Sequence, residues 1–176
     1  MAIARAKCFC RTCGKTFEYT AQKHNRREAD NFEAWAATHI IECDDCTQAR
    51  INAERAEENE KSARIATENE YPALSGTDRQ IPWAMTIRQK AIETLHTYCT
   101  DPKHEKDFPW LRHYDKLFTD FLLTRTSAAW WIENRSSCNN ISALCHTMLE
   151  TNGTEYRRIC AEVEKIKKGQ ESFRTA

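Results

Sequence analysis

Hydrophobic and polar positions divide the chain into regions with different periodicities. Residues 7–20 are rich in aromatic and β-branched residues, which predicts a short β-hairpin. From residue 77 onward, apolar positions recur every three or four residues, which predicts amphipathic helices. Between these regions, residues 47–70 are polar, rich in helix formers and free of glycine and proline, which predicts a long, solvated helix.

The N-terminal region carries two more predicted elements. Asp30–Glu33 has the character of a capping box, which predicts a short helix over residues 30–38. Residues 40–42 read as a short strand that leads back toward the hairpin.

A break at Tyr71–Gly76 marks a boundary, because proline and glycine interrupt helices. Thr77 and Gln80 form a capping box for a helix that runs to about residue 99. Further helical segments follow: Ser127 is expected to cap one, Asn139 or Asn140 is expected to cap another, and we expect Gly169 to end the last one. These signals predict a mainly α fold in four parts: a zinc-ribbon or treble-clef-like β module (1–46), a long solvated connecting helix (47–72), a C-terminal helical bundle (73–169) and a polar tail (170–176).

Nine cysteines are many for 176 residues, and two pairs have the spacing of metal ligands. Cys10 and Cys13 form one C-x-x-C motif, followed by Gly14, and Cys43 and Cys46 form another. Four thiolates close a tetrahedral zinc site, so the sequence predicts a structural Zn²⁺ held by these residues. The aromatic residues Phe9, Phe17 and Tyr19 are then expected to pack over the metal.

Three alternatives to this ligand set stay open at the sequence level. In the first alternative, the thiols are unliganded or form a redox pair. Cys8 lies on the same strand face as Cys10 and is an alternative ligand, although Cys10 alone makes a C-x-x-C with Cys13. His24 or His39 is a further replacement candidate.

Composition narrows the function classes. Lys and Arg balance Asp and Glu at 26 each, which argues against a generally basic nucleic-acid binder but allows a local basic patch. The first 30 residues hold seven basic against three acidic residues, and the candidates for phosphate contacts are Lys7, Arg11, Lys15, Lys23, Arg26 and Arg27. A solvated surface explains the same excess equally well. No apolar run reaches the ~20 residues of a membrane helix, so we expect no membrane contact and a cytoplasmic location.

A few other side chains are candidates for chemistry or binding. The nucleotide-binding glycine motifs and H-E-x-x-H are absent from the sequence, which predicts a non-enzymatic protein. Trp130 and Trp131 cannot point the same way on one helix, so one is expected in the core and the other at a partner surface. Arg88 lies on an apolar helix face, and a carboxylate such as Glu133 is expected to pair with it.

Two segments together resemble a recurrent pattern in small uncharacterised bacterial and phage proteins. In those proteins L-x-G-x-x-x-Q-x-x-W-A-x-x-I-R is followed by A-x-x-W-I-x-x-R, often behind a zinc ribbon. Here the segments are Leu74–Arg88 and Ala128–Arg135. The resemblance implies an origin in a phage or mobile element and an anti-defence role like that of anti-CRISPR proteins. We therefore expect stoichiometric binding to a host protein or ribonucleoprotein complex in a bacterial or infected host cell, or alternatively a nucleic-acid-binding regulator that uses the basic zinc module on DNA or RNA.

Overall fold

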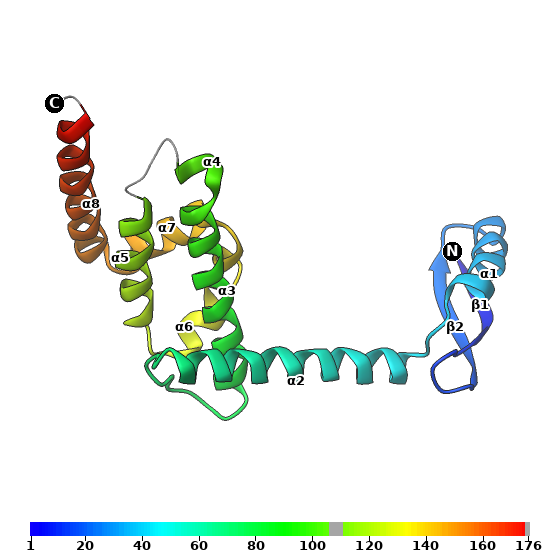
Figure 1. Cartoon of the computed structure of the whole chain (residues 1–176). Helices are drawn as coiled ribbons and strands as arrows, with labels where there is room; N and C mark the ends of the chain where they lie inside the picture. The colour runs from blue at the N-terminus through cyan, green and yellow to red at the C-terminus, as the bar shows by residue number, and fades with distance from the viewer. Residues whose placement is uncertain (106–110, 175–176) are drawn as a thin grey trace. The chain divides into compact units, whose positions relative to one another are not determined.

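The computed structural model describes residues 1–105 and 111–174 and separates into two compact units, Met1–Glu57 and Glu58–Ala176 (Figure 1). The first unit holds a two-stranded sheet, one whole helix and the start of a second. The second unit is helical. The predicted fold class is therefore confirmed: the protein is mainly α, with a small N-terminal sheet and a helical C-terminal region.

The hairpin is longer than the sequence indicated. Strands β1 (Ala2–Phe9) and β2 (Thr16–Lys23) pair antiparallel, from Ala2 opposite Lys23 to Phe9 opposite Thr16. Successive residues of a strand face opposite sides. One face therefore buries Ala4, Ala6 and Cys8 beneath helix α1, and the other is exposed.

Aromatic residues of the hairpin divide between these two faces. Phe17 and Tyr19 pack against the small core around Ala6 and Cys8. Phe9 lies one position past Cys8, so its side chain points to the other face and is 57% exposed. Phe9 therefore does not pack with Phe17 and Tyr19, contrary to the expectation that the three residues pack together over the metal.

Helix α1 (Arg26–His39) begins four residues earlier than expected. Asn25 Oδ1 accepts a hydrogen bond from the Glu28 amide, and a Glu28 carboxylate oxygen accepts one from the His24 amide. Asn25 is therefore the N-cap of α1, Glu28 accepts from the residue before it, and the capping-box residues expected at 30–33 lie inside the helix. Residues 40–42 do not form the expected strand; there, the Arg11 amide donates to the Ile41 carbonyl at 2.8 Å.

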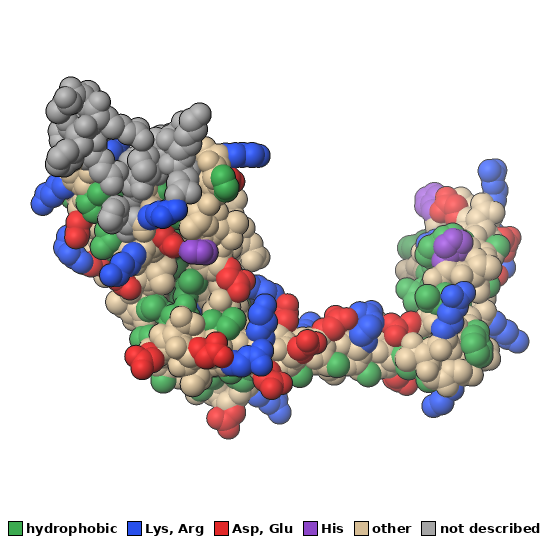
Figure 2. All heavy atoms as spheres, viewed as in Figure 1, with side chains coloured by type: hydrophobic (Ala, Val, Ile, Leu, Met, Phe, Trp, Pro, Cys, Tyr) green, Lys and Arg blue, Asp and Glu red, His purple; other side chains and the backbone are tan. Residues whose placement is uncertain are grey.

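Helix α2 (Asp44–Glu68) begins just before the predicted start, so Cys46 lies in its first turn. Asp44 and Asp45 favour that start because carboxylates stabilise a helix N-terminus. Figure 2 shows charged side chains of both signs along this helix, and most of its residues are exposed.

The C-terminal end of α2 packs within the helical unit. Asn59 Oδ1 accepts a hydrogen bond from Thr86 Oγ1 at 2.8 Å. After Glu68, the Tyr71 amide donates to the Ala66 carbonyl, and Glu70 takes a positive φ of 53°. This is the Schellman geometry that usually places glycine at the position of Glu70.

Helix α3 (Gln80–Thr100) is the central element of the helical unit, and its predicted cap is confirmed. The Thr77 amide donates to Gln80 Oε1 at 3.1 Å, and the Gln80 amide donates back to Thr77 Oγ1 at 3.3 Å. The other helices described are α4 (Pro102–Glu105), α5 (Leu111–Leu123), α6 (Ala128–Glu133), the 3₁₀ turn η1 (Ser137–Asn139), α7 (Ile141–Thr151) and α8 (Gly153–Arg174).

The helical unit has one main hydrophobic core. Trp131, Phe118, Leu95, Leu122, Leu144 and Met148 are among its fully buried large side chains. Ser127 and Asn140 cap α6 and α7 as predicted, with their side chains accepting from the Trp130 and Ala143 amides. Gly169 does not end α8, which continues through residue 174; a glycine in a helix costs only about 1 kcal/mol.

The two segments Leu74–Arg88 and Ala128–Arg135 meet in this unit. Ser75 donates its amide to the Thr126 carbonyl, and its own carbonyl accepts from the Ala128 amide at 2.9 Å. A Cβ atom on Gly76 would come within 2.7 Å of the Ala128 Cβ. A side chain in place of Gly76 would therefore clash with the Ala128 side chain.

No helix in the described part of the chain is both long and apolar enough to cross a membrane.

Candidate metal centre

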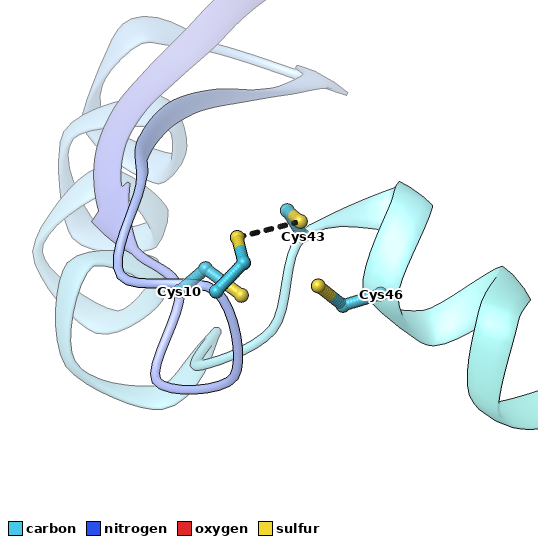
Figure 3. A group of neighbouring side chains, drawn as sticks. Cys10, Cys43 and Cys46 are labelled. Atoms are coloured by element: carbon cyan, nitrogen blue, oxygen red, sulfur yellow. Dashed lines mark hydrogen bonds between the residues drawn. The ribbon is translucent and has the colours of Figure 1, made fainter.

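Two turns of the N-terminal unit bring four cysteines together. Cys10 and Cys13 lie in the turn that joins β1 to β2, Cys43 immediately precedes α2, and Cys46 lies in the first turn of that helix. Their sulfur atoms all lie within 4.8 Å of one another. Figure 3 shows Cys10, Cys43 and Cys46 converging on one point between the turn and the helix. The structure therefore assembles the four residues that the sequence singled out.

The first turn has the backbone of a zinc knuckle. The Gly14 amide donates to the Cys10 carbonyl at 2.9 Å, and the Cys10 amide donates to the Lys15 carbonyl at 2.9 Å. Gly14 has a φ of +73°, a conformation that side-chain-bearing residues rarely adopt. The tight turn holds both sulfurs of this C-x-x-C on one side.

The sulfur separations fit a tetrahedral metal ion. Zn–S bonds of about 2.3 Å give sulfur–sulfur edges of roughly 3.8 Å in a tetrahedron. Cys13 Sγ lies 3.8 Å from Cys43 Sγ. In Figure 3, the dashed line ends on the sulfur of Cys43. All four cysteines are free thiols rather than disulfides. The cluster can therefore hold one metal ion with four sulfur ligands, leaving no open position for a reacting water.

The electrostatics of the cluster favour a cation. Backbone amides of Cys43 and Cys13 hydrogen-bond to Cys10 and lower the pKa of its thiol to about 6, although burial acts in the opposite direction. The pKa of Cys46 is raised, first by its hydrogen bond with Cys43 and then by burial and the other thiols. One thiolate thus forms readily while its neighbour resists ionisation. A bound divalent cation would remove this repulsion.

Glu42 links the two turns of the metal centre, a role that was not predicted from the sequence. Its carboxylate accepts hydrogen bonds from Thr12 Oγ1 and Thr47 Oγ1, each at 3.1 Å, and from Arg50 Nε at 3.3 Å. Desolvation raises the pKa of Glu42, but these three donors outweigh it and lower the pKa below its ordinary value. In the sequence, only the position of Glu42 next to Cys43 indicated a role at the metal centre. Its hydrogen-bond partners come from both the knuckle turn and α2.

The alternative ligands lie elsewhere. Cys8 is buried against α1, where its Sγ lies 3.5 Å from the Ala36 carbonyl oxygen, and burial raises the pKa of its thiol. The His39 ring stacks on Trp35 with its centroid 4.9 Å away. His24 contacts Glu28 through its backbone amide. Neither histidine nor Cys8 belongs to the described cluster.

The basic residues predicted as a phosphate-contacting set do not share one surface. Lys7 is exposed on the open face of the sheet, and Arg11 and Lys15 are exposed in the knuckle turn. Lys23 instead places its Nζ 3.7 Å from the centroid of the Phe32 ring, on the side of α1. Arg26 forms an ion pair with Asp30 at 2.6 Å.

The remaining member, Arg27, lies at the start of α1 and is exposed. The six residues predicted to contact phosphates are thus divided: some lie on the sheet and the knuckle turn, and the others lie on or against α1. Arg5, which was not in that set, joins Lys7 on the open face.

The tryptophan pair is also resolved. Trp131 is fully buried and donates its indole N–H to the Arg125 carbonyl at 2.8 Å, so it has no surface to offer a partner. Trp130 is half-buried and packs edge-on against Trp131. Trp83 is the more exposed side chain, at 47%.

Comparison of the chain with protein-family models, curated proteins and solved structures found no match.

Proposed function

We propose that this protein is a non-enzymatic, zinc-containing binding protein that acts stoichiometrically on a host macromolecular complex. The four-cysteine cluster supports the proposal of a bound zinc ion. Its sulfur spacing suits Zn²⁺, and four cysteine ligands are typical of a structural zinc site. The non-enzymatic part rests on the sequence, which carries none of the catalytic motifs considered above.

The observation that carries the binding role is the open face of the hairpin. On β1 this face presents Ile3 and Phe9, 53% and 57% exposed, with Arg5 and Lys7 between them. By register, β2 contributes Gln22, Thr20, Glu18 and Thr16 to the same face. Exposed aromatic and arginine side chains are enriched at the energetic centres of protein interfaces.

This face lies close to the metal centre along the chain. Phe9 directly precedes Cys10, so the same turn that carries two metal ligands also ends the strand. Loss of the metal would release the end of β1 and disorder the surface. We infer that the metal acts by shaping the binding face rather than by touching the partner.

The identity of the partner follows from the sequence resemblance. A phage or mobile-element protein with these segments is expected to act on a bacterial defence system, such as a CRISPR-type complex, in the cytoplasm of the host cell. The alternation of apolar and cationic residues on the open face suits an acidic protein surface with apolar pockets.

The alternative function is nucleic-acid binding by the same unit. Arg5 and Lys7 on the sheet, together with Arg11 and Lys15 in the knuckle, give four exposed cations near the exposed ring of Phe9. Cations that contact phosphates beside an aromatic ring that stacks on bases are the recurring elements of single-strand binding. Glu18 pairs with Lys7 across the two strands, and its negative charge would repel phosphates, which argues against nucleic-acid binding.

An affinity pull-down from host lysate, with and without nuclease, separates the two functions. We expect a discrete complex at one copy of this chain per target, unchanged by nuclease and lost when Arg5 and Lys7 are both replaced by Glu. Matched replacement of exposed Lys61 and Arg64 on α2 should leave recovery unchanged. Recovery that disappears on nuclease treatment would establish the nucleic-acid alternative, and recovery insensitive to the Arg5 and Lys7 changes would exclude the open face.

A further inference from the structure

The helical unit contains a pocket of about 360 Å³. Its lining residues all belong to the second unit, whereas the four cysteines belong to the first. Its wall comes from the end of α2, the turn that follows it and the first turns of α3. The apolar part of the wall includes Tyr71, Leu74, Ile81 and Met85, and the cationic part is Arg88. The volume is at the lower end of the range for small-molecule sites.

Arg88 is a buried cation without the partner that the sequence predicted. Its side chain is 2% exposed, and Nη1 donates to the Pro72 carbonyl at 2.7 Å. Its guanidinium carbon lies 5.5 Å from the centroid of the Tyr71 ring. Among the described residues no carboxylate forms an ion pair with it, and the expected pairing with Glu133 is wrong.

An unpaired buried arginine is costly, so its position needs an explanation. A guanidinium has five N–H donors, and the Pro72 carbonyl accepts from one nitrogen. Burial lowers the pKa of Arg88, which records the cost of desolvating the charge. An apolar residue of similar volume would fill the site more favourably if packing were its only role.

The turn beside Arg88 is held in an uncommon conformation. Glu70, with its φ of 53°, reverses the chain after α2 and places Tyr71 and Pro72 over Arg88. The positive φ of Glu70 is that of the Schellman turn, and this turn fixes Tyr71 and Pro72 beside the Arg88 side chain. The Glu70 side chain is exposed at the pocket wall and has no described ion pair with Arg88.

We propose that this pocket binds a small organic carboxylate, with its anionic group on Arg88 and its apolar body against Tyr71, Leu74 and Met85. The planar guanidinium matches a carboxylate in a two-point hydrogen bond. The apolar wall selects a ligand with an aromatic or branched hydrocarbon body over a small hydrophilic anion. This site is separate from the proposed binding face, and its failure would leave that proposal standing.

Benzoate and its neutral analogue benzamide test the proposal on the full-length protein. We expect benzoate to raise Tm in a concentration-dependent way and to shift the NMR signals of the Leu74, Ile81 and Met85 methyl groups. Benzamide should bind at least about tenfold more weakly, because it lacks the charge that Arg88 would pair. Equal binding of the two, or no shift of these methyl signals at high benzoate concentration, would overturn the proposal.

Variants assign the binding to Arg88. Replacement Arg88→Met is expected to weaken benzoate binding by roughly 10- to 100-fold, the loss of a charge-assisted hydrogen-bond pair. Arg64→Met, at an exposed arginine of α2, is the matched control and should bind like the wild type. Arg88→Lys keeps the charge without the planar fork and should bind more weakly than the wild type, which gives a second test if Arg88→Met does not fold. Wild-type affinity in a folded Arg88→Met or Arg88→Lys protein would contradict the assignment.

Discussion

Replacing Cys10 by serine is expected to abolish stoichiometric zinc binding and to unfold the unit Met1–Glu57, while the helical unit stays folded. A structural zinc site contributes about 10–16 kcal/mol of folding free energy in small zinc modules. That is as large as the whole stability of a typical domain, so loss of one of four ligands should be decisive.

The core of this unit explains why the metal matters so much. Its fully buried apolar residues are all small: Ala4, Ala6, Cys8, Cys10, Ala29 and Ala36. Larger side chains such as Phe17 and Tyr19 are only partly buried around them. A unit of this size with so little buried apolar surface needs a further source of stability. The four cysteines supply it by joining the knuckle turn to the start of α2.

The matched control is Cys8→Ser, the same substitution two residues away. Cys8 lies outside the cluster, and its thiol contacts the Ala36 carbonyl oxygen of α1 instead. Zinc content by elemental analysis and hydrogen exchange of residues 1–57 should be near the wild-type values in this variant and lost in Cys10→Ser. Full zinc and unchanged exchange in Cys10→Ser would show that Cys10 is not a ligand.

Replacing Trp131 by alanine is expected to destabilise the helical unit by about 3–5 kcal/mol. The indole is fully buried in the main core, and its loss leaves a cavity that the packed helices can fill only in part. The substitution also removes the indole donor to the Arg125 carbonyl. A change of this size should lower the urea midpoint strongly.

Trp83→Ala is the control for this prediction. Trp83 is 47% exposed, and its described contact is a cation–π pair with Arg135 at 5.9 Å, so its removal should cost about 1 kcal/mol or less. Urea unfolding followed by far-UV circular dichroism measures both variants. Similar costs for the two substitutions would contradict the assignment of Trp131 to the core.

Local signals in the sequence predicted the metal cluster and several helix starts. The two C-x-x-C pairs and Gly14 indicated the four clustered cysteines, because the spacing within each pair is itself the geometry of the ligands. The caps at Thr77, Ser127 and Asn140 were found for the same reason: each hydrogen bond closes within three residues.

Features set by tertiary contacts were beyond this reasoning. Spacing alone did not decide where α1 begins, because Asn25–Glu28 and Asp30–Glu33 both place a glutamate three residues after a capping residue, and the structure uses the first. Arg88 was expected to pair with Glu133, but the turn after α2 places the Pro72 carbonyl and the Tyr71 ring there instead. Glu42 joins Thr12 to Thr47 across the two turns, so its role appears only once the cysteines are together.

X-ray absorption spectroscopy at the zinc edge of the purified protein tests the central claim most directly. With one zinc ion per chain, we predict a first shell of four sulfur atoms at about 2.3 Å and no nitrogen or oxygen ligand. Absence of zinc from protein purified under reducing conditions with zinc supplied, or a shell containing nitrogen or oxygen, would contradict a closed centre made of Cys10, Cys13, Cys43 and Cys46.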